Sequence, residues 1–179
     1  ANPYGSPSLE ELCAGKKDIV IISSDHTRPV PSRVTMPILL HHIHSAAPEA
    51  RVRILVATGM HRPSTHEELV NKYGEEIVAN EEIVMHVATD DSMMKKIGTL
   101  PSGGECIINK IAVDCDLLLA EGFIEPHFFA GFSGSRKSVL PGIASYKTIM
   151  YNHNGQFVND SHSRAGNLCH NHVSEDMFA

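Results

Sequence analysis

The sequence predicts an α/β fold with a mostly parallel, Rossmann-like sheet flanked by helices. Short runs rich in β-branched residues alternate with stretches of helical apolar spacing, and polar, turn-rich passages follow several of these runs. Strand, loop, helix and strand in this order are typical of βαβ units. The length of 179 residues predicts a single domain, residues 1–179.

The first predicted strand is KDIVIIS, residues 17–23, an apolar run that ends in polar turn residues, as a buried parallel strand does. From residue 33 to residue 47, apolar side chains repeat at helical spacing, and Ser32 is a candidate N-cap for this helix. RVRILVAT, residues 51–58, predicts the next strand.

STHEELVNKYG predicts a helix that is capped by Ser64 or Thr65 and ends at Gly74. The remaining predictions are strands at residues 83–88, 105–108 and 115–122, and a helix at residues 144–151.

Composition argues against several classes of protein. A net charge of -6 without a Lys/Arg cluster is atypical of nucleic-acid binders. No apolar run approaches the ~20 residues that span a bilayer, and no secretory signal is recognisable. The four cysteines show no metal-binding or disulfide spacing, which predicts buried, reduced thiols in a cytoplasmic protein: Cys13, Cys106, Cys115 and Cys169.

Three polar passages follow predicted strands: SSDHTRP, ATGMHRPST and EGFIEPHFFAGFSGSRK. The carboxyl ends of the strands in an open α/β sheet face one crevice, where ligands bind. We therefore expect one group of polar side chains to converge there. Its members are Asp25, His26, Arg28, His61, Arg62, His127, Arg136 and Lys137.

Lys137 stands between a glycine-rich loop and the apolar stretch SVLPGI, which predicts a partly buried amine. A buried lysine loses its charge readily and can act as a nucleophile or covalent tether. Gly131 and Gly134 would let backbone N–H groups approach a phosphate or another anion. The passage does not match the P-loop pattern GxxxxGK[ST].

Several of the 12 histidines have a structural interpretation. His41, His42 and His44 occupy nearby positions of one predicted helix, where adjacent residues do not face each other, so a solvated helix face is expected rather than a metal cluster. His170 and His172 lie in polar sequence and are predicted to belong to a mobile, solvated end.

The blocks SSDHTRPVPS, ATGMHRPSTHEEL, GEEIVANEEIV and AEGFIEPHFFAGFSGSRKSVLPGIAS occur in this order along nearly the whole chain. Together they resemble the N-terminal domain of the lactate racemase family, the nickel-pincer-dependent 2-hydroxyacid racemases and epimerases. The resemblance implies a longer, two-domain enzyme whose C-terminal domain is absent from this chain. It also implies that the isolated domain has little or no activity.

The resemblance further implies a cofactor, the nickel-pincer nucleotide. This is a pyridinium-3-thioamide-5-thiocarboxylic acid mononucleotide that holds nickel through two sulfurs and a ring carbon. Lys137 would be joined to it through the thioamide, and His153 would complete the nickel coordination. Asp25 and Arg28 match the polar residues at the cofactor and substrate. The cofactor-binding set also includes Gly131, Gly134 and Arg136. Separate biosynthetic enzymes would supply the cofactor.

The implied reaction interconverts the D and L isomers of a small 2-hydroxy acid. Hydride transfer to the cofactor avoids a carbanion beside a carboxylate, and His61 and His127 would act as the acid/base pair. Two histidines with pKa values near ~6.5 suit a step that runs in both directions at neutral pH. Arg28 would bind the substrate carboxylate or the cofactor, because a guanidinium binds such groups bidentately.

Two alternatives remain open at this point. One is a hydrolase or lyase that uses a simple metal bound by Asp25, His26 and His61. The other is a non-catalytic nucleotide- or phosphate-binding module. No nucleic-acid or membrane partner is expected.

Overall fold

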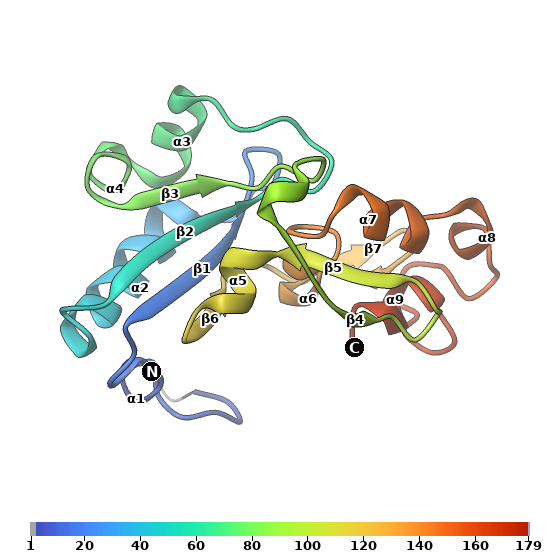
Figure 1. Cartoon of the computed structure of the whole chain (residues 1–179), viewed down its shortest axis with the longest axis horizontal. Helices are drawn as coiled ribbons and strands as arrows, with labels where there is room; N and C mark the ends of the chain where they lie inside the picture. Colours follow the sequence, from blue (N-terminus) through green and yellow to red (C-terminus); the bar gives the residue numbers. More distant parts are fainter. Residues whose placement is uncertain (1–2, 179) are drawn as a thin grey trace.

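A four-stranded parallel sheet forms the centre of the fold (Figure 1). The computed structural model describes residues 3–178, apart from the side chain of Ser135. The strand order is β3-β2-β1-β6, and every pair is parallel. The strands are β1 (Asp18–Ser24), β2 (Arg51–Ala57), β3 (Glu82–Met85) and β6 (Leu117–Ala120). The predicted α/β fold with a parallel sheet is confirmed.

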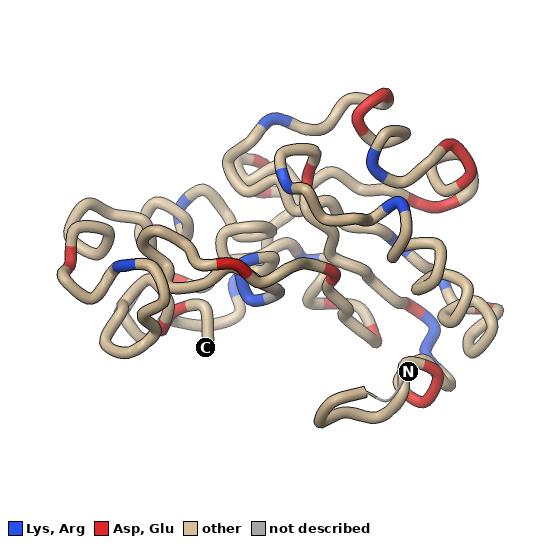
Figure 2. The backbone as a smooth tube through the Cα atoms, turned by 180° about the vertical axis from the view of Figure 1, so that it is seen from behind, with Lys and Arg blue, Asp and Glu red and all other residues tan. Residues whose placement is uncertain are grey.

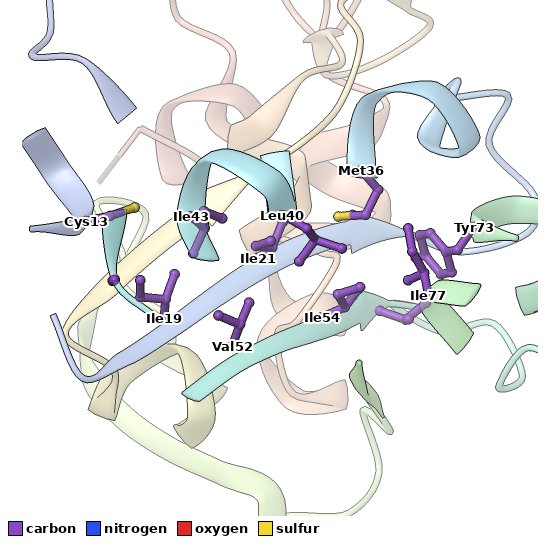
Figure 3. Packing of buried hydrophobic residues seen from close by; sticks show 12 residues of the cluster. Cys13, Ile19, Ile21, Met36, Leu40, Ile43, Val52, Ile54, Tyr73 and Ile77 are labelled. Carbon is purple, nitrogen blue, oxygen red and sulfur yellow. The ribbon is translucent and has the colours of Figure 1, made fainter. Parts of the chain in front are cut away.

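Helices cover both faces of this sheet, because successive strand residues point to opposite sides. On one face, Ile19 and Ile21 of β1 pack against side chains of α2, α3 and α4 (Figure 3). On the other face, Val20 and Ile22 pack with α5 and with Ile143. The helices of these layers are α1 (Leu9–Cys13), α2 (Ser32–Ala46), α3 (His66–Tyr73), α4 (Glu75–Asn80) and α5 (Lys110–Asp114). Full burial of each such aliphatic side chain contributes about 1.5–3 kcal/mol.

The later part of the chain forms a second group of elements beside the sheet (Figure 1). It packs around a cluster that includes Leu100, Ile108, Ala130 and Val173. Its elements are η1 (Asp91–Met93), β4 (Met94–Thr99), β5 (Glu105–Asn109), β7 (Pro126–His127), β8 (Gly131–Phe132), α6 (Ser135–Val139), α7 (Tyr146–Asn152), α8 (Gly155–Val158) and α9 (His172–Asp176). The strand predicted at residues 105–108 exists as β5, but it pairs antiparallel with β4 outside the main sheet.

Local capping rules hold for one predicted helix and fail for the other. The Thr65 hydroxyl accepts a hydrogen bond from the N–H of Glu68, whose carboxylate accepts one from the N–H of Thr65, and α3 ends at Gly74. Ser32 is not an N-cap: it is the first residue of α2, after Pro31. Its hydroxyl donates instead to Glu121, a partner 89 positions away.

Two further expectations hold only in part. His170 and His172 are exposed as predicted, but Val173 and Asp176 beside them are buried, so this end of the chain is packed against the fold. The apolar side of α9 belongs to the second cluster. The polar residues around it in the sequence gave no indication of this packing. The cysteines also differ among themselves, because Cys13 is buried while Cys169 is exposed.

Figure 2 shows acidic and basic residues interspersed along the backbone. None of the helices between residues 3 and 178 is long and apolar enough to span a bilayer. His41, His42 and His44 are exposed on α2, so their prediction as a solvated helix face is confirmed.

Candidate functional site

The carboxyl ends of three adjacent strands open onto one cavity of about 450 Å³. The strands β2, β1 and β6 are neighbours, and their register places Ser24 beside Ala57 and Ile22 beside Ala120. The segments that follow these strands line the cavity, together with α6 and the end of α7. Cavities at this edge of an open parallel sheet are typical ligand sites.

Most of the predicted site residues line this cavity, although they are distant in the sequence. They are Asp25, Arg28, His61, His127, Gly134, Lys137 and His153. Gly131, Arg136, His26 and Arg62 do not line it.

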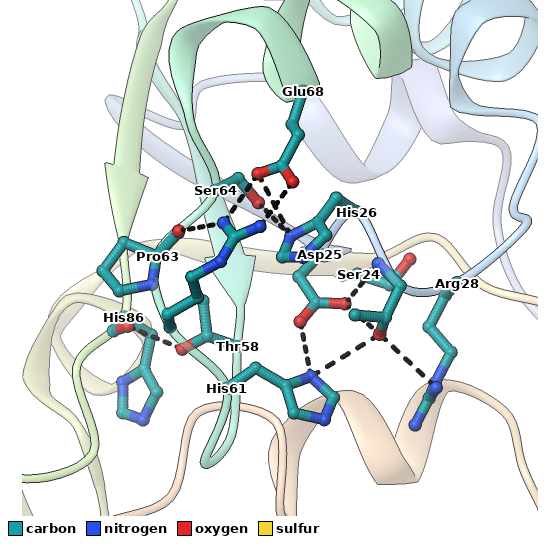
Figure 4. A network of polar contacts seen from close by, with 12 residues as sticks. Ser24, Asp25, His26, Arg28, Thr58, His61, Pro63, Ser64, Glu68 and His86 are labelled. Carbon is teal, nitrogen blue, oxygen red and sulfur yellow. Dashed lines mark hydrogen bonds and ion pairs between the residues drawn. The ribbon is translucent and has the colours of Figure 1, made fainter.

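His61 is held by a carboxylate (Figure 4). Its Nδ1 lies 2.6 Å from Oδ2 of Asp25, which is only 2 % exposed. The other carboxylate oxygen accepts hydrogen bonds from the N–H and hydroxyl of Thr27, at 3.0 and 2.6 Å. Because Asp25 accepts the proton of Nδ1, a neutral His61 ring carries its lone pair at Nε2.

Opposing influences act on Asp25. Burial alone raises the pKa of this carboxyl, but hydrogen bonds from Thr27 and His61 outweigh it, so that the pKa lies below its usual value. Asp25 is therefore a carboxylate at neutral pH and fixes the orientation of the His61 ring.

His127 has a different environment, beside an amine. Its Nε2 lies 3.3 Å from Nζ of Lys137, and its Nδ1 accepts a hydrogen bond from the N–H of Ala130 at 3.2 Å. The neutral ring then carries its proton at Nε2, which it can donate to Lys137 only when the amine is uncharged. Burial, followed by the charges of Arg28 and Arg136, lowers the pKa of Lys137 to about 8, which raises the uncharged fraction of an amine that is still mostly protonated at pH 7.

The pKa of His127 departs from the expectation. Burial, then the positive charges of Lys137 and Arg28, lower it to about 4. The expected value near ~6.5 is therefore wrong for this histidine, because the sequence did not reveal how far the ring is buried or how closely two cations approach it.

His153 lies at the C-cap of α7, with its ring edge-to-face against Phe129 at 5.2 Å between centroids. Its Nδ1 is buried and has no hydrogen-bond partner within the described part of the chain. Burial, then Lys137 and His127, lower its pKa to about 4. The side chain is thus a neutral imidazole on the cavity wall, and its Nδ1 is a buried nitrogen without a partner among residues 3–178.

Gly131 and Arg136 do not line the cavity but contact the C-terminal part of the chain. Gly131 adopts φ +76°, and a Cβ there would lie 2.3 Å from the carbonyl oxygen of Asn167, so the chain packs too closely for any other residue. Arg136 donates to the Ser174 hydroxyl at 2.8 Å and lies 4.3 Å from the Phe178 ring centroid. Gly134, at φ +119°, does line the cavity.

His26 faces away from the cavity. Its Nδ1 lies 2.9 Å from the Ser64 hydroxyl and 3.6 Å from the Glu68 carboxylate (Figure 4). Asp25, His26 and His61 therefore do not converge into one metal site, and no group of three His, Cys, Asp or Glu side chains with that geometry occurs among residues 3–178.

Sequence reasoning missed two residues at this site. Phe129 lies between the rings of His127 and His153, and the Nζ of Lys137 is 5.6 Å from its centroid. Glu121 is buried directly after β6 and accepts three hydroxyl hydrogen bonds. The signal for Glu121 was an acidic residue that ends an apolar strand run.

Residues 1–166 match the protein family described as the lactate racemase N-terminal domain. The chain is 73% identical over 176 residues to a lactate racemase of Lactiplantibacillus plantarum, and 55% identical over 177 residues to one of Thermoanaerobacterium thermosaccharolyticum. These alignments cover 98% and 99% of the chain but 42% of each relative. The chain thus spans less than half the length of these relatives.

Solved structures agree with this relationship. The lactate racemase apoprotein from T. thermosaccharolyticum superposes with a TM-score of 0.97 at 55% identity, covering 99% of this chain and 42% of that one. A protein from Thermotoga maritima shares the fold, with a TM-score of 0.79 at 22% identity, over 94% of this chain and 44% of that one. The resemblance carried by the four sequence blocks is confirmed.

Proposed function

The chain belongs to the lactate racemase N-terminal domain family, and we propose that it is the cofactor-binding, catalytic part of a 2-hydroxyacid racemase, with lactate as the first substrate to test. One observation carries the proposal. An amine, its neighbouring imidazole and two further histidines from distant segments line a single cavity: Lys137, His127, His61 and His153.

The cavity residues fit the nickel-pincer nucleotide. Lys137 is partly buried with its pKa lowered to about 8, so an appreciable fraction of the amine is uncharged and nucleophilic near neutral pH. Condensation of this amine with a thioacid group would form a thioamide and release water. His153 is a neutral imidazole on the cavity wall, and imidazole is a good ligand for nickel. When bound, the cofactor would supply a hydride acceptor.

The two remaining histidines would handle the proton of the substrate hydroxyl. His61, oriented by Asp25, presents a lone pair at Nε2 and accepts that proton. His127, whose neutral ring carries its proton at Nε2, would donate to the substrate oxygen from the other side. With Lys137 joined to the cofactor, the lysine nitrogen would not accept a hydrogen bond, and the Nε2–H of His127 would be available to the substrate.

Attachment would also change the basicity of His127. The Lys137 cation is the second cause of its lowered pKa, and a thioamide carries no charge. The pKa of His127 would therefore rise on attachment, which lets the ring gain and lose a proton in the two directions of the reaction.

Arg28 is an exposed guanidinium on the cavity wall, where it would bind the substrate carboxylate or a cofactor oxygen. Gly134 would let the backbone approach the cofactor, and Gly131 and Arg136 would hold the same segment in place through the contacts described above. Residues supplied by the C-terminal domain of a longer protein would complete the substrate site.

Intact-mass spectrometry of protein produced together with the cofactor-making enzymes tests this proposal. We expect a covalent increment on the wild type that is lost in Lys137→Ala and retained in Lys147→Ala, an exposed lysine on α7. An unmodified chain that holds zinc would favour the metal hydrolase. Retained nucleotide without metal or covalent bond would favour the binding module.

A further inference from the structure

Glu121 is a buried carboxylate that the proposed reaction does not use. It is 7 % exposed and directly follows β6. Its Oε1 accepts hydrogen bonds from the hydroxyls of Ser23, at 2.6 Å, and Ser32. Its Oε2 accepts one from the hydroxyl of Thr35 at 2.7 Å. Three hydroxyl donors on one buried carboxylate form a satisfied polar network.

These donors stand on either side of one loop. Ser23 lies near the end of β1, whereas Ser32 and Thr35 lie in the first turn of α2. The loop between them carries Asp25 and Arg28, which line the cavity. The side chain of Glu121, the residue after β6, therefore binds both ends of the loop that carries these two residues.

Lys72, whose charge interacts with that of Glu121, makes no hydrogen bond or ion pair to its carboxylate. The Nζ of Lys72 donates to the hydroxyl of Ser24 at 3.3 Å, and the Glu121 carboxylate instead accepts its three bonds from uncharged groups. Tyr73 extends the network by donating to the Ser23 hydroxyl at 2.8 Å. The Ser23 proton is thereby directed at Glu121.

We infer that Glu121 is a positioning residue that holds the Asp25–Pro31 loop in the shape in which Asp25 orients His61 and Arg28 reaches the cavity. The inference rests on the proposed function for its catalytic meaning, but the geometry of the loop can be measured without catalysis. Asp25 reports that geometry, because its lowered pKa depends on hydrogen bonds from Thr27 and His61.

The test compares Glu121→Ala, Glu121→Gln and Thr35→Val in the 179-residue chain, by carbon-detected NMR titration of the Asp25 carboxyl. In Glu121→Ala the loop loses its anchor, and we expect the pKa of Asp25 to rise. Removing a nearby negative charge alone would lower that pKa, so the two effects have opposite signs.

Glu121→Gln should restore the wild-type value or fall slightly below it. Its amide oxygen can accept from Ser23 and Ser32, while its NH₂ group donates to Thr35, whose hydroxyl turns to the Pro31 carbonyl 3.3 Å away. Thr35→Val removes one anchor with little change in shape, so a smaller rise is expected. Tyr73→Phe is the structural control, because it loses a buried hydrogen bond but leaves all three bonds to Glu121.

In the complete, cofactor-loaded enzyme, Glu121→Ala should raise KM and lower kcat for the 2-hydroxy acid, each by roughly tenfold or more, and Glu121→Gln should recover most of both. An Asp25 pKa that stays unchanged or falls in folded Glu121→Ala overturns the inference and leaves the proposed function intact. If that variant does not fold, an unchanged Asp25 pKa in Thr35→Val overturns it. Racemisation missing from the wild type refutes the proposed function, whereas the titration still decides the role of Glu121.

Discussion

His61 and His127 line the same cavity, but the charged groups beside the two rings are of opposite sign. His61 stands with 46% of its side chain exposed against a buried carboxylate, Asp25. His127 is half-buried beside Lys137, and Arg28 adds a second positive charge to its surroundings. A carboxylate thus orients one ring, whereas burial, reinforced by two cations, keeps the other ring neutral.

Because of this difference, the two neutral histidines carry their protons on different ring nitrogens. His61 presents a lone pair at Nε2, and His127 presents an N–H at the corresponding atom. In the proposed reaction, one ring would accept the hydroxyl proton and the other would return a proton to the same oxygen. The pKa of His127 depends in part on the charge of Lys137, so the proposed covalent modification of that lysine would change the basicity of the histidine.

The largest expected effect comes from removing either ring. His61→Gln and His127→Gln should each reduce racemisation in the complete, cofactor-loaded enzyme by about 10²–10⁴-fold, the usual contribution of general acid–base catalysis. The mass increment at Lys137 should persist in both variants. His66→Gln, an exposed histidine at the start of α3, serves as the control. Near-normal turnover in either variant would remove that histidine from the pair.

A smaller loss of activity is expected from substitution of Asp25, the carboxylate that orients His61. Asp25→Asn leaves the His61 base in place but removes the carboxylate that orients it, so kcat should fall by roughly 10- to 100-fold, less than for loss of the ring itself. Steady-state kinetics with both isomers measure this effect. Equal kcat values for Asp25→Asn and the wild type would show that His61 does not need the carboxylate.

The effect of the Lys137 charge on the pKa of His127 can be tested without cofactor. Lys137→Met removes a charge next to His127, so the pKa of His127 should rise from about 4 towards the ordinary value, but only in part, because burial is the larger cause. An NMR titration of the imidazole measures it, with Lys147→Met as the control. A pKa that stays near 4 would show that the lysine has no influence on the ring.

The smallest effect concerns acid stability. The folded pKa values of His127 and His153 are about 4, and burial also lowers that of His86, against ~6.5 in an unfolded chain. The unfolded state therefore binds more protons between these values, and stability present above pH ~6.5 is lost as the pH falls towards 4. Urea midpoints measured from pH 7.5 to 4.5 should decline steadily. A flat profile over this range contradicts the assignment of neutral buried rings.

Local signals were sufficient for much of the fold. The β-branched runs of β1 and β2 and the capping box at Thr65 depend on neighbouring residues, so they could be predicted from a short window. The β4–β5 pair and the packing of α9 could not, because a short polar segment acquires its partners only from distant parts of the chain. Ser32 failed as a cap for the same reason.

The sequence by itself determined the family, the order of strands and polar loops, and therefore which side chains would face one crevice. The tertiary structure alone decided which of these side chains line the cavity. Gly131 and Arg136 contact the C-terminal segment instead. Glu121 binds Ser23 and Ser32, which lie 98 and 89 positions away in the sequence. It also decided the neutral state of His127. Burial and the distance between two charges are properties of the folded chain, because each depends on residues that only folding brings together.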